Sequence, residues 1–529
     1  MDVTAESGVR FRHDAGRTGQ KQLPETMGAG VALLDFDGDG DLDLFFVQSG
    51  PFPGAGAGPS RPALYRNDGG FRFTDVTEAS GLCTTSYGQG VTVGDCDNDG
   101  DPDLFVTGFG RSTLWRNEGK GVFTDATDRA GIANPRWGTS AAFLDYDRDG
   151  RPDLFVANYL TYDPAKNPWC GRPEPELRAY CHPDHFTGAA NALWRNQGDG
   201  TFTDVTRAAG LWTEEGKGLG VVAFDGDDDG WTDLYVANDS VRNFLFRNRG
   251  DGTFEDVTLR AGVGYSQDGR TQAGMGTEAG DLDGDGRPEL VVTNLDDETN
   301  TVYRSLGDGT WEDRTWASGM GEASFPWVGW GVAFPDLDHD GDRDVYVVNG
   351  HLQDNVAKTH PERTWGQLDL VMENLGGLKL RNVAGAMGRY FTAERALSGR
   401  GLATGDLDGD GDLDLVVSHN HGPPTLLRND GGNRRSWALF DLVGARGRDA
   451  WGARVRVEAG GRTQTAEVSG GGSYCSRGDR RLHFGLGAAE RIDRLIVRWP
   501  SGPEESFTKV AARRVWVVRE GAGRLEERR

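Results

Sequence analysis

Short apolar runs recur in a fixed order along most of the chain, separated by acidic and glycine-rich turns. A Gly- and Ala-rich run, as at residues 27–34, precedes an acidic loop, and a Leu-x-Val-like run follows that loop. A Leu-x-Arg-Asn-like run and a Phe-x-Asp-Val-Thr run complete the unit, as at residues 64–67 and 73–77. Four short strands per unit, repeated seven times, predict an all-β fold with a seven-bladed β-propeller.

The two ends of the repeat region predict how the propeller closes. Residues 2–8 resemble the end of a unit, whereas the seventh unit stops at residues 426–430 without a final run of its own. We therefore expect the N-terminal strand to complete the last blade, so that residues 1–432 form one propeller. The small side chains of the first run in each unit suit it to the innermost strand, where the blades converge.

The pattern changes at about residue 433. Apolar and polar residues alternate with period two at residues 437–443, 453–457, 463–468, 481–487, 494–499 and 514–518. This alternation predicts a small antiparallel β-sandwich over residues 433–529. The region is more basic than the rest of the chain, so we expect it to pack against the acidic propeller.

The acidic loop of each unit has the pattern D-x-D-x-D-G-x-x-D. Its first, third and fifth places are Asp in all seven copies, and its ninth place is Asp in six copies and Glu in one. The seventh place includes Arg and Trp, whose side chains cannot bind calcium, so its backbone carbonyl is the predicted ligand. The predicted metal-binding residues are Asp35, Asp37, Asp39, Asp41 and Asp43; Asp95, Asp97, Asp99, Asp101 and Asp103; Asp145, Asp147, Asp149, Arg151 and Asp153; Asp225, Asp227, Asp229, Trp231 and Asp233; Asp281, Asp283, Asp285, Arg287 and Glu289; Asp336, Asp338, Asp340, Asp342 and Asp344; and Asp406, Asp408, Asp410, Asp412 and Asp414.

Calcium is the cation that these loops favour, because it takes six to eight oxygen ligands and the Gly in sixth place allows a tight turn. The loops are not EF-hands, since the twelfth position is Phe46 in the first copy and Val106 in the second. Solvated Asp/Gly hairpin turns are the alternative, but a turn needs no third carboxylate. Up to seven structural Ca²⁺ ions are expected, and seven dications would change the net charge from −25 to −11.

The acidic composition bears on partners and location. A net charge of −25 argues against nucleic acid or an anionic membrane as the main partner. No run of 18 apolar residues is present, so no membrane span is expected. The first residues are already repeat sequence without a signal peptide, which predicts a cytoplasmic protein if this N-terminus is native and a secreted or periplasmic one if a leader was removed.

Five cysteines and one tripeptide are further candidates. Cys170 and Cys181 lie in one Pro-rich insertion with little apolar content, and we expect a disulfide between them. Cys83, Cys96 and Cys475 have no evident partner. Residues 477–479 spell Arg-Gly-Asp, the integrin-binding tripeptide, although such a triplet arises often by chance.

Histidines and asparagines gather at the strand ends that lie away from the acidic loops. His351, His419 and His421 are the candidate catalytic residues, because a His-rich rim could bind a second metal or supply a general base. The alternative is that these side chains cap strand ends by bonding loop backbone. No nucleophile elbow, phosphate loop, zinc motif or dinucleotide fingerprint is present.

The acidic loops with their Phe-x-Asp-Val-Thr tails resemble FG-GAP/VCBS repeats, the calcium-loop blades of the integrin α-subunit head. The C-terminal stretch, with Gly-Ala-Arg-Val at 452–455, His-Phe-Gly-Leu-Gly at 483–487 and Val-Arg-Trp-Pro-Ser-Gly at 497–502, looks like an ASPIC/UnbV domain. Together they resemble the cartilage acidic protein (CRTAC-like) family. The resemblance implies a calcium propeller followed by a β-sandwich, usually secreted, with no common biochemical activity.

Two functions follow as hypotheses. The first is a calcium-binding module or scaffold, extracellular or periplasmic, that holds a protein or carbohydrate. The second is an enzyme of specialised metabolism with a small-molecule substrate and a pocket on the propeller's upper face, because the family resemblance implies bacterial relatives that sit in natural-product gene clusters of the enediyne type. A deep pocket with convergent histidines would favour the enzyme.

Overall fold

The computed structural model describes residues 1–52, 61–82, 86–132, 134–173 and 176–528. Among them, seven antiparallel sheets follow one another along the chain, and we number them sheets 1 to 7. The predicted all-β fold class is confirmed. The strands are β1 (Val31–Leu34), β2 (Asp43–Phe46), β3 (Ala63–Asn67) and β4 (Phe73–Asp75); β5 (Tyr87–Gly94), β6 (Asp103–Phe109), β7 (Thr113–Asn117) and β8 (Phe123–Asp125); β9 (Gly138–Leu144), β10 (Asp153–Asn158), β13 (Ala192–Asn196) and β14 (Phe202–Asp204); β15 (Gly218–Phe224), β16 (Asp233–Asn238), β17 (Phe244–Asn248) and β18 (Phe254–Asp256); β19 (Thr277–Gly280), β20 (Glu289–Val292), β21 (Thr301–Ser305) and β22 (Trp311–Asp313); β23 (Gly329–Ala333), β24 (Val345–Asn349), β25 (Leu370–Asn374) and β26 (Leu380–Asn382); and β27 (Gly399–Gly405), β28 (Asp414–His419) and β29 (Thr425–Leu427).

The first strands of these sheets lie side by side in a closed series. Each contacts the first strand of the next sheet, and β27 of sheet 7 contacts β1 of sheet 1. The N-terminus lies along the outer edge of sheet 7, where the Val3 N–H donates to Leu426 O (3.0 Å) and the Arg428 N–H donates to Met1 O (2.8 Å). The first residues therefore take the position of a fourth strand in the last sheet.

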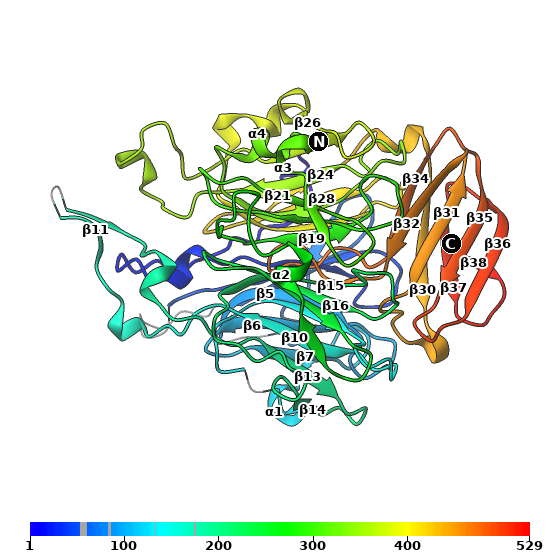
Figure 1. Cartoon of the computed structure of the whole chain (residues 1–529), viewed down its shortest axis with the longest axis horizontal. Helices are drawn as coiled ribbons and strands as arrows, with labels where there is room; N and C mark the ends of the chain where they lie inside the picture. The colour runs from blue at the N-terminus through cyan, green and yellow to red at the C-terminus, as the bar shows by residue number, and fades with distance from the viewer. Residues whose placement is uncertain (53–60, 83–85, 133, 174–175, 529) are drawn as a thin grey trace.

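The C-terminal region forms two further sheets, drawn in orange and red beside the propeller in Figure 1. The antiparallel prediction is wrong at one pair, because β30 and β37 run parallel. The β35–β36 hairpin between them belongs to the other sheet and supplies the crossover that parallel strands need. The strands are β34 (Leu482–Gly487), β30 (Ser436–Val443), β37 (Val515–Arg519) and β38 (Leu525–Glu527) in one sheet, and β32 (Arg462–Glu467), β31 (Arg454–Ala459), β35 (Arg491–Arg498) and β36 (Glu504–Ala511) in the other.

Residues 469–481, here called the hub segment, leave this C-terminal domain and enter the centre of the propeller. Within the segment, β33 (Gly470–Gly471) pairs with β15 of sheet 4. Further hydrogen bonds of the segment reach first strands of sheets 5, 3, 2, 1 and 7, among them Thr277 N to Ser473 O (3.0 Å), Cys475 N to Ser140 Oγ (2.9 Å), Val91 N to Cys475 O (3.0 Å), Leu33 N to Arg477 O (3.0 Å) and Asp479 N to Thr404 O (2.9 Å).

Glycines in the first strands make room for the hub segment. A Cβ added to Gly30 would lie 2.2 Å from Cys475 O, and one added to Gly90 would lie 2.9 Å from the Cys475 Cα. Atoms at such short distances would have to move apart. The small residues of the first strands are therefore explained by the hub segment that passes them, as well as by the convergence of the sheets.

Helices are few and short in the described part of the chain: α1 (Thr127–Ala130), α2 (Thr258–Ala261), α3 (Thr315–Ser318) and α4 (Met320–Ser324). None of the helices described is long and apolar enough to cross a membrane. The insertion after sheet 3's second strand carries a separate hairpin, β11 (Cys170–Arg172) and β12 (Leu177–Ala179), which projects at the left of Figure 1.

Candidate metal centres at the acidic loops

The backbone of each acidic loop is folded around its own carboxylates. In the loop of sheet 4, the Gly230 N–H donates to Asp225 Oδ2 (2.8 Å) and the Trp231 N–H donates to Asp229 Oδ1 (2.9 Å). Gly230 has a φ of 86°, a conformation that favours glycine. The same two bonds recur in the other six loops.

The ninth-place carboxylate has a structural role of its own. Asp233 accepts from Gly226 N (3.2 Å) with one oxygen and from Asn248 N (2.7 Å) with the other. It thereby joins the start of its loop to the end of the third strand. In sheet 5 the longer Glu289 accepts from Leu282 N (2.7 Å) instead, and its other oxygen, Oε1, has no hydrogen-bond partner.

Carboxylates of the loops converge in sets that fit a divalent cation, and one of these sets includes a ninth-place residue, Asp153. The groups whose ligand atoms lie within 4.8 Å of one another include Asp35, Asp37 and Asp39; Asp95, Asp97 and Asp99; Asp145, Asp147 and Asp153; Asp225, Asp227 and Asp229; and Asp281, Asp283 and Asp285. Four first- or third-place carboxylates have a buried oxygen without a hydrogen-bond donor, Oδ1 of Asp35, Asp97, Asp225 and Asp408. A buried carboxylate oxygen without a donor is costly, and a hard cation would satisfy it.

Burial also shifts the acidity of the loops. Removal from water raises the pKa of Asp95 to about 7 and that of Asp145 to about 6. In the ninth place, burial raises the pKa of Asp153 and of Glu289 to about 9. A bound dication would oppose these shifts, because it stabilises the ionised form.

Arginines of the third strands lie beside the acidic loops and form ion pairs with them. The sequence did not predict these contacts, although an Arg recurs near the end of the third strand. Arg247 pairs with Asp227 (2.5 Å) and Asp229 (2.9 Å), and Arg304 pairs with Asp283 (2.5 Å) and Asp285 (2.7 Å). Arg116 and Arg195 occupy the same position in sheets 2 and 3. These pairs offset part of the loops' negative charge.

An Asn lies at or just after the end of the third strand in six of the seven sheets, and it connects neighbouring sheets. The Asn248 Nδ2 donates to Tyr146 O (2.8 Å) in the loop of sheet 3 and to Thr232 O (3.1 Å) in its own loop. Sheet 5 has Ser305 at this position, and within the described residues its side chain only accepts from Gly307 N (3.4 Å) and makes no bond to the preceding loop. The corresponding bonds to the preceding loop are Asn67 to Leu407 O, Asn117 to Phe36 O, Asn196 to Cys96 O, Asn374 to Leu282 O and Asn429 to Leu337 O.

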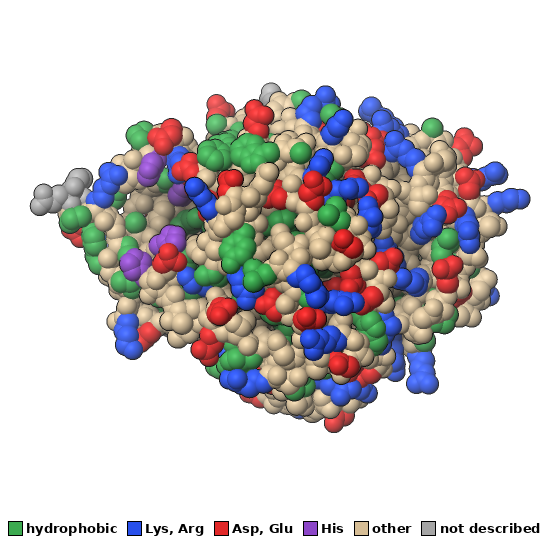
Figure 2. Space-filling model, viewed as in Figure 1, with side chains coloured by type: hydrophobic (Ala, Val, Ile, Leu, Met, Phe, Trp, Pro, Cys, Tyr) green, Lys and Arg blue, Asp and Glu red, His purple; other side chains and the backbone are tan. Residues whose placement is uncertain are grey.

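The C-terminal domain lies across the acidic loops, as its basic composition predicts. Figure 2 shows acidic and basic side chains interspersed over the face in view. The backbone N–H of Asp95 also donates to Asp449 Oδ2 (3.0 Å) of the C-terminal domain. The ion pairs between domains include Arg528 with Asp35 (2.9 Å), Arg498 with Asp225 (3.0 Å) and Arg462 with Asp342 (3.1 Å).

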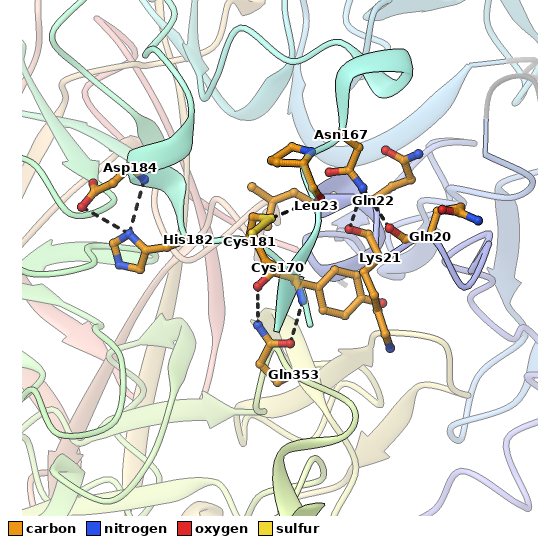
Figure 3. Close-up of a disulfide and its surroundings, with 12 residues drawn as sticks. Gln20, Lys21, Gln22, Leu23, Asn167, Cys170, Cys181, His182, Asp184 and Gln353 are labelled. Carbon is orange, nitrogen blue, oxygen red and sulfur yellow. Dashed lines mark hydrogen bonds and ion pairs between the residues drawn. A yellow bond between two sulfur atoms is a disulfide. The ribbon is translucent and has the colours of Figure 1, made fainter. Parts of the chain in front are cut away.

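The face opposite the C-terminal domain is covered by three segments that pack on one another (Figure 3). They are residues 20–23, the disulfide-bonded insertion with Asn167, Cys170 and Cys181, and the segment around Gln353. Gln353 bonds the backbone N and O of Tyr180 (2.9 and 2.8 Å), and Asn167 donates to Gln20 O (2.8 Å). The predicted disulfide between Cys170 and Cys181 is confirmed, with 5.3 Å between its Cα atoms. Cys96 and Cys475 are buried free thiols, and Cys83 lies outside the described residues.

The three candidate catalytic histidines have separate partners. His351 is buried with its Nε2 3.7 Å from Asp296 Oδ2, and His419 is buried with its Nδ1 2.8 Å from Pro423 O. Burial lowers the pKa of His419 to about 4. His421 is partly exposed, and its Nδ1 lies 3.4 Å from Asp14 Oδ1. The contact with a loop carbonyl agrees with the capping alternative for His419, and the enzyme hypothesis stays a prediction.

The Arg-Gly-Asp tripeptide lies inside the hub segment. Arg477 is 8% exposed and donates to Gly471 O (2.8 Å) and Ser469 O (2.9 Å), while the Asp479 side chain pairs with Arg481 (2.7 Å). Neither charged group is presented to a partner in this fold.

Two known families match this chain, one in the propeller region and one in the C-terminal domain. The FG-GAP-like repeat family matches residues 35–106, 95–156, 225–292 and 281–347, and the ASPIC and UnbV family matches residues 444–525. The chain is therefore an FG-GAP repeat protein with a C-terminal ASPIC and UnbV domain.

Cartilage acidic protein 1 is among its relatives, which confirms the predicted resemblance. The Homo sapiens protein is 28% identical over 281 residues, covering 51% of this chain and 39% of that protein. The Xenopus tropicalis protein is 28% identical over 288 residues, covering 53% of this chain and 41% of that protein. The chain thus matches less than half the length of these relatives.

Solved structures show weaker likeness. An Agrocybe aegerita lectin that recognises non-reducing terminal N-acetylglucosamine is 17% identical with a TM-score of 0.40, over 67% of this chain and 79% of that one. YCF48 bound to D1 peptide is 9% identical with a TM-score of 0.41, over 77% of this chain and 93% of that one. Scores this low carry no argument about function.

Proposed function

We propose that the protein is a calcium-stabilised binding or scaffold module that acts in an oxidising compartment outside the cytoplasm. The observation that carries the proposal is the set of buried carboxylate oxygens without donors, Oδ1 of Asp35, Asp97, Asp225 and Asp408. Calcium bound by the acidic loops would satisfy them. The Cys170–Cys181 disulfide supports the compartment, because disulfides persist where the surroundings are oxidising.

Calcium would also fix how the two domains sit together. Arg528 and Arg498 of the C-terminal domain contact first-place loop residues Asp35 and Asp225. A loop whose carboxylates are held around a cation presents these residues in one geometry. The module is therefore proposed to be a rigid unit when calcium is bound.

Calcium titration of the metal-free protein tests this role. Asp97→Asn removes one charge from a cluster member with a partnerless oxygen, and we expect it to remove about one calcium site. Asp101→Asn is the matched control in the same loop, because the seventh place contributes its backbone carbonyl. Equal calcium binding by wild type and Asp97→Asn would refute the assignment.

The binding face is proposed to be the one covered by residues 159–173, 176–191 and 351–369, since the C-terminal domain occupies the loop side. Trp169 beside the disulfide is 45% exposed there. An oligosaccharide array probed with wild type, Trp169→Ala and Trp316→Ala tests a carbohydrate ligand. Trp316, which lies in α3 and is 57% exposed, is the control, so its variant should bind as wild type does, whereas Trp169→Ala should not.

A further inference from the structure

Two histidines and an aspartate meet in the buried junction between sheet 6, sheet 7 and the C-terminal domain. His339 comes from the acidic loop of sheet 6, Asp412 from the loop of sheet 7, and His483 from β34. His339 and Asp412 are 0% exposed and His483 is 9% exposed. The repeat pattern does not predict this contact, because the three residues come from two different loops and from a strand of the other domain.

The three side chains have free ligand atoms. Both ring nitrogens of His339, the Nδ1 of His483 and the Oδ1 of Asp412 are buried without a hydrogen-bond partner. The His339 Nε2 lies 3.6 Å from Asp412 Oδ1, too far for a hydrogen bond, and the two imidazole rings are 4.7 Å apart between centroids. Four partnerless polar atoms in one buried place are costly unless something bridges them.

In His483 and Asp412 the other polar atom of the side chain is held by the backbone. The His483 Nε2 lies 3.2 Å from Gly411 O and must donate to it, because a carbonyl only accepts, so Nδ1 keeps its lone pair. The Asp412 Oδ2 accepts from Gly431 N (3.1 Å), so Oδ1 is the free oxygen. A backbone partner on the far side of a ligating group is what orients metal ligands in proteins.

We propose that the side chains of His339, His483 and Asp412 bind a borderline transition-metal dication such as Zn²⁺, at a position distinct from the calcium positions inside the loops, where Asp412 would contribute only its backbone carbonyl. Two imidazoles and one carboxylate suit zinc and its neighbours, whereas calcium takes oxygen ligands. Ligands at about 2.0–2.1 Å around a tetrahedral ion are about 3.4 Å apart, close to the distance between His339 Nε2 and Asp412 Oδ1. Water completes the coordination.

The space for the ion is left open by a glycine. A Cβ added to Gly432 would lie 2.9 Å from Asp412 Oδ1 and 3.2 Å from His339 Nε2. The ion would link the last two propeller sheets to the C-terminal domain at one point, independently of what the module binds.

Zinc titration of the calcium-saturated full chain tests the site by calorimetry. We expect about one equivalent of Zn²⁺, and a loss of affinity of at least about 100-fold in His339→Asn and in His483→Gln. His339 has a φ of 56°, and the same loop position in sheet 2 holds Asn98 with a φ of 59°, so Asn suits this backbone. His360→Asn, a change at an exposed histidine, is the matched control and should bind zinc as wild type does.

Cobalt provides a measurement that needs no variant. Co²⁺ added to the calcium-saturated wild type should give the visible absorption of a four-coordinate ion, and X-ray absorption should report two imidazole ligands. Three outcomes would overturn the proposal: no zinc equivalent bound, undiminished binding by both histidine variants, or a cobalt spectrum of oxygen ligands alone. The three residues would then be a buried polar cluster without a metal.

Discussion

Replacing Asn248 by serine should weaken the propeller at the junction of sheets 3 and 4. The amide of Asn248 is fully buried and donates to Tyr146 O (2.8 Å) and Thr232 O (3.1 Å). Its Oδ1 accepts from Gly250 N (2.9 Å), a contact that a serine oxygen can partly replace, as Ser305 does for Gly307 N in sheet 5 (3.4 Å). The change therefore removes two donor bonds and leaves one buried and one partly buried carbonyl with one partner fewer.

The magnitude follows from the bonds lost. A buried hydrogen bond contributes about 1 kcal/mol net, and a buried group left without its partner costs about 1–3 kcal/mol, so Asn248→Ser should cost roughly 2–4 kcal/mol. An unfolding entropy of about 2.1 cal/mol/K per residue makes 1 kcal/mol worth about 1 °C for a cooperative unit as long as the propeller. We expect Tm to fall by about 2–4 °C in saturating calcium.

Ser305→Ala is the matched control. Ser305 holds the position of Asn248 in sheet 5, where no amide donates to the preceding loop among the described residues. The change therefore removes only a side-chain oxygen. Its single long contact predicts a change below about 1 °C. Thermal unfolding followed by calorimetry measures both variants side by side. Equal shifts in the two variants, or no shift in Asn248→Ser, would refute the idea that the asparagines hold neighbouring sheets together.

Four further outcomes are expected. Chelation of calcium should lower Tm markedly, since each site filled at a hundredfold above Kd stabilises by about 2.7 kcal/mol; an unchanged melt in chelator would contradict structural calcium. The metal-free protein should lose stability as pH rises between about 6 and 9. The raised pKa of carboxyls such as Asp153 and Glu289 makes the folded state hold protons that the unfolded state has already released. Calcium should abolish this dependence on pH. Gly90→Ala should lower Tm and expose the hub segment to protease, while Gly385→Ala, at an open position, should change neither. Deleting residues 1–12 should lower Tm severely, because it strips the outer edge of sheet 7; a melt like that of the full chain would exclude closure by the N-terminus.

The repeat strands and the acidic loops could be predicted because their determinants are local. Alternation, the loop carboxylates and the turn glycine act over about ten residues, and seven copies make the pattern plain. The Arg and Asn of the third strand recur just as regularly, and attention to their spacing from the loop could have found their contacts.

The hub segment and the histidine cluster could not be found in the same way. Cys475 bonds Ser140 and Val91, and His483 meets His339 and Asp412, so each contact joins residues far apart in the sequence. No local pattern marks them, since glycines near residue 470 are equally typical of a surface turn. The parallel pairing of β30 with β37 is hidden for the same reason.

The hub segment follows all seven propeller sheets along the chain, which sets an order on biosynthesis. Sheets 1 to 7 are translated before residues 469–481, so a propeller that forms during synthesis has an open axis until this segment emerges. A message truncated between sheet 7 and this segment would encode all seven propeller sheets without the residues that fill their centre. Completion of the propeller therefore depends on a stretch of sequence far from the acidic loops.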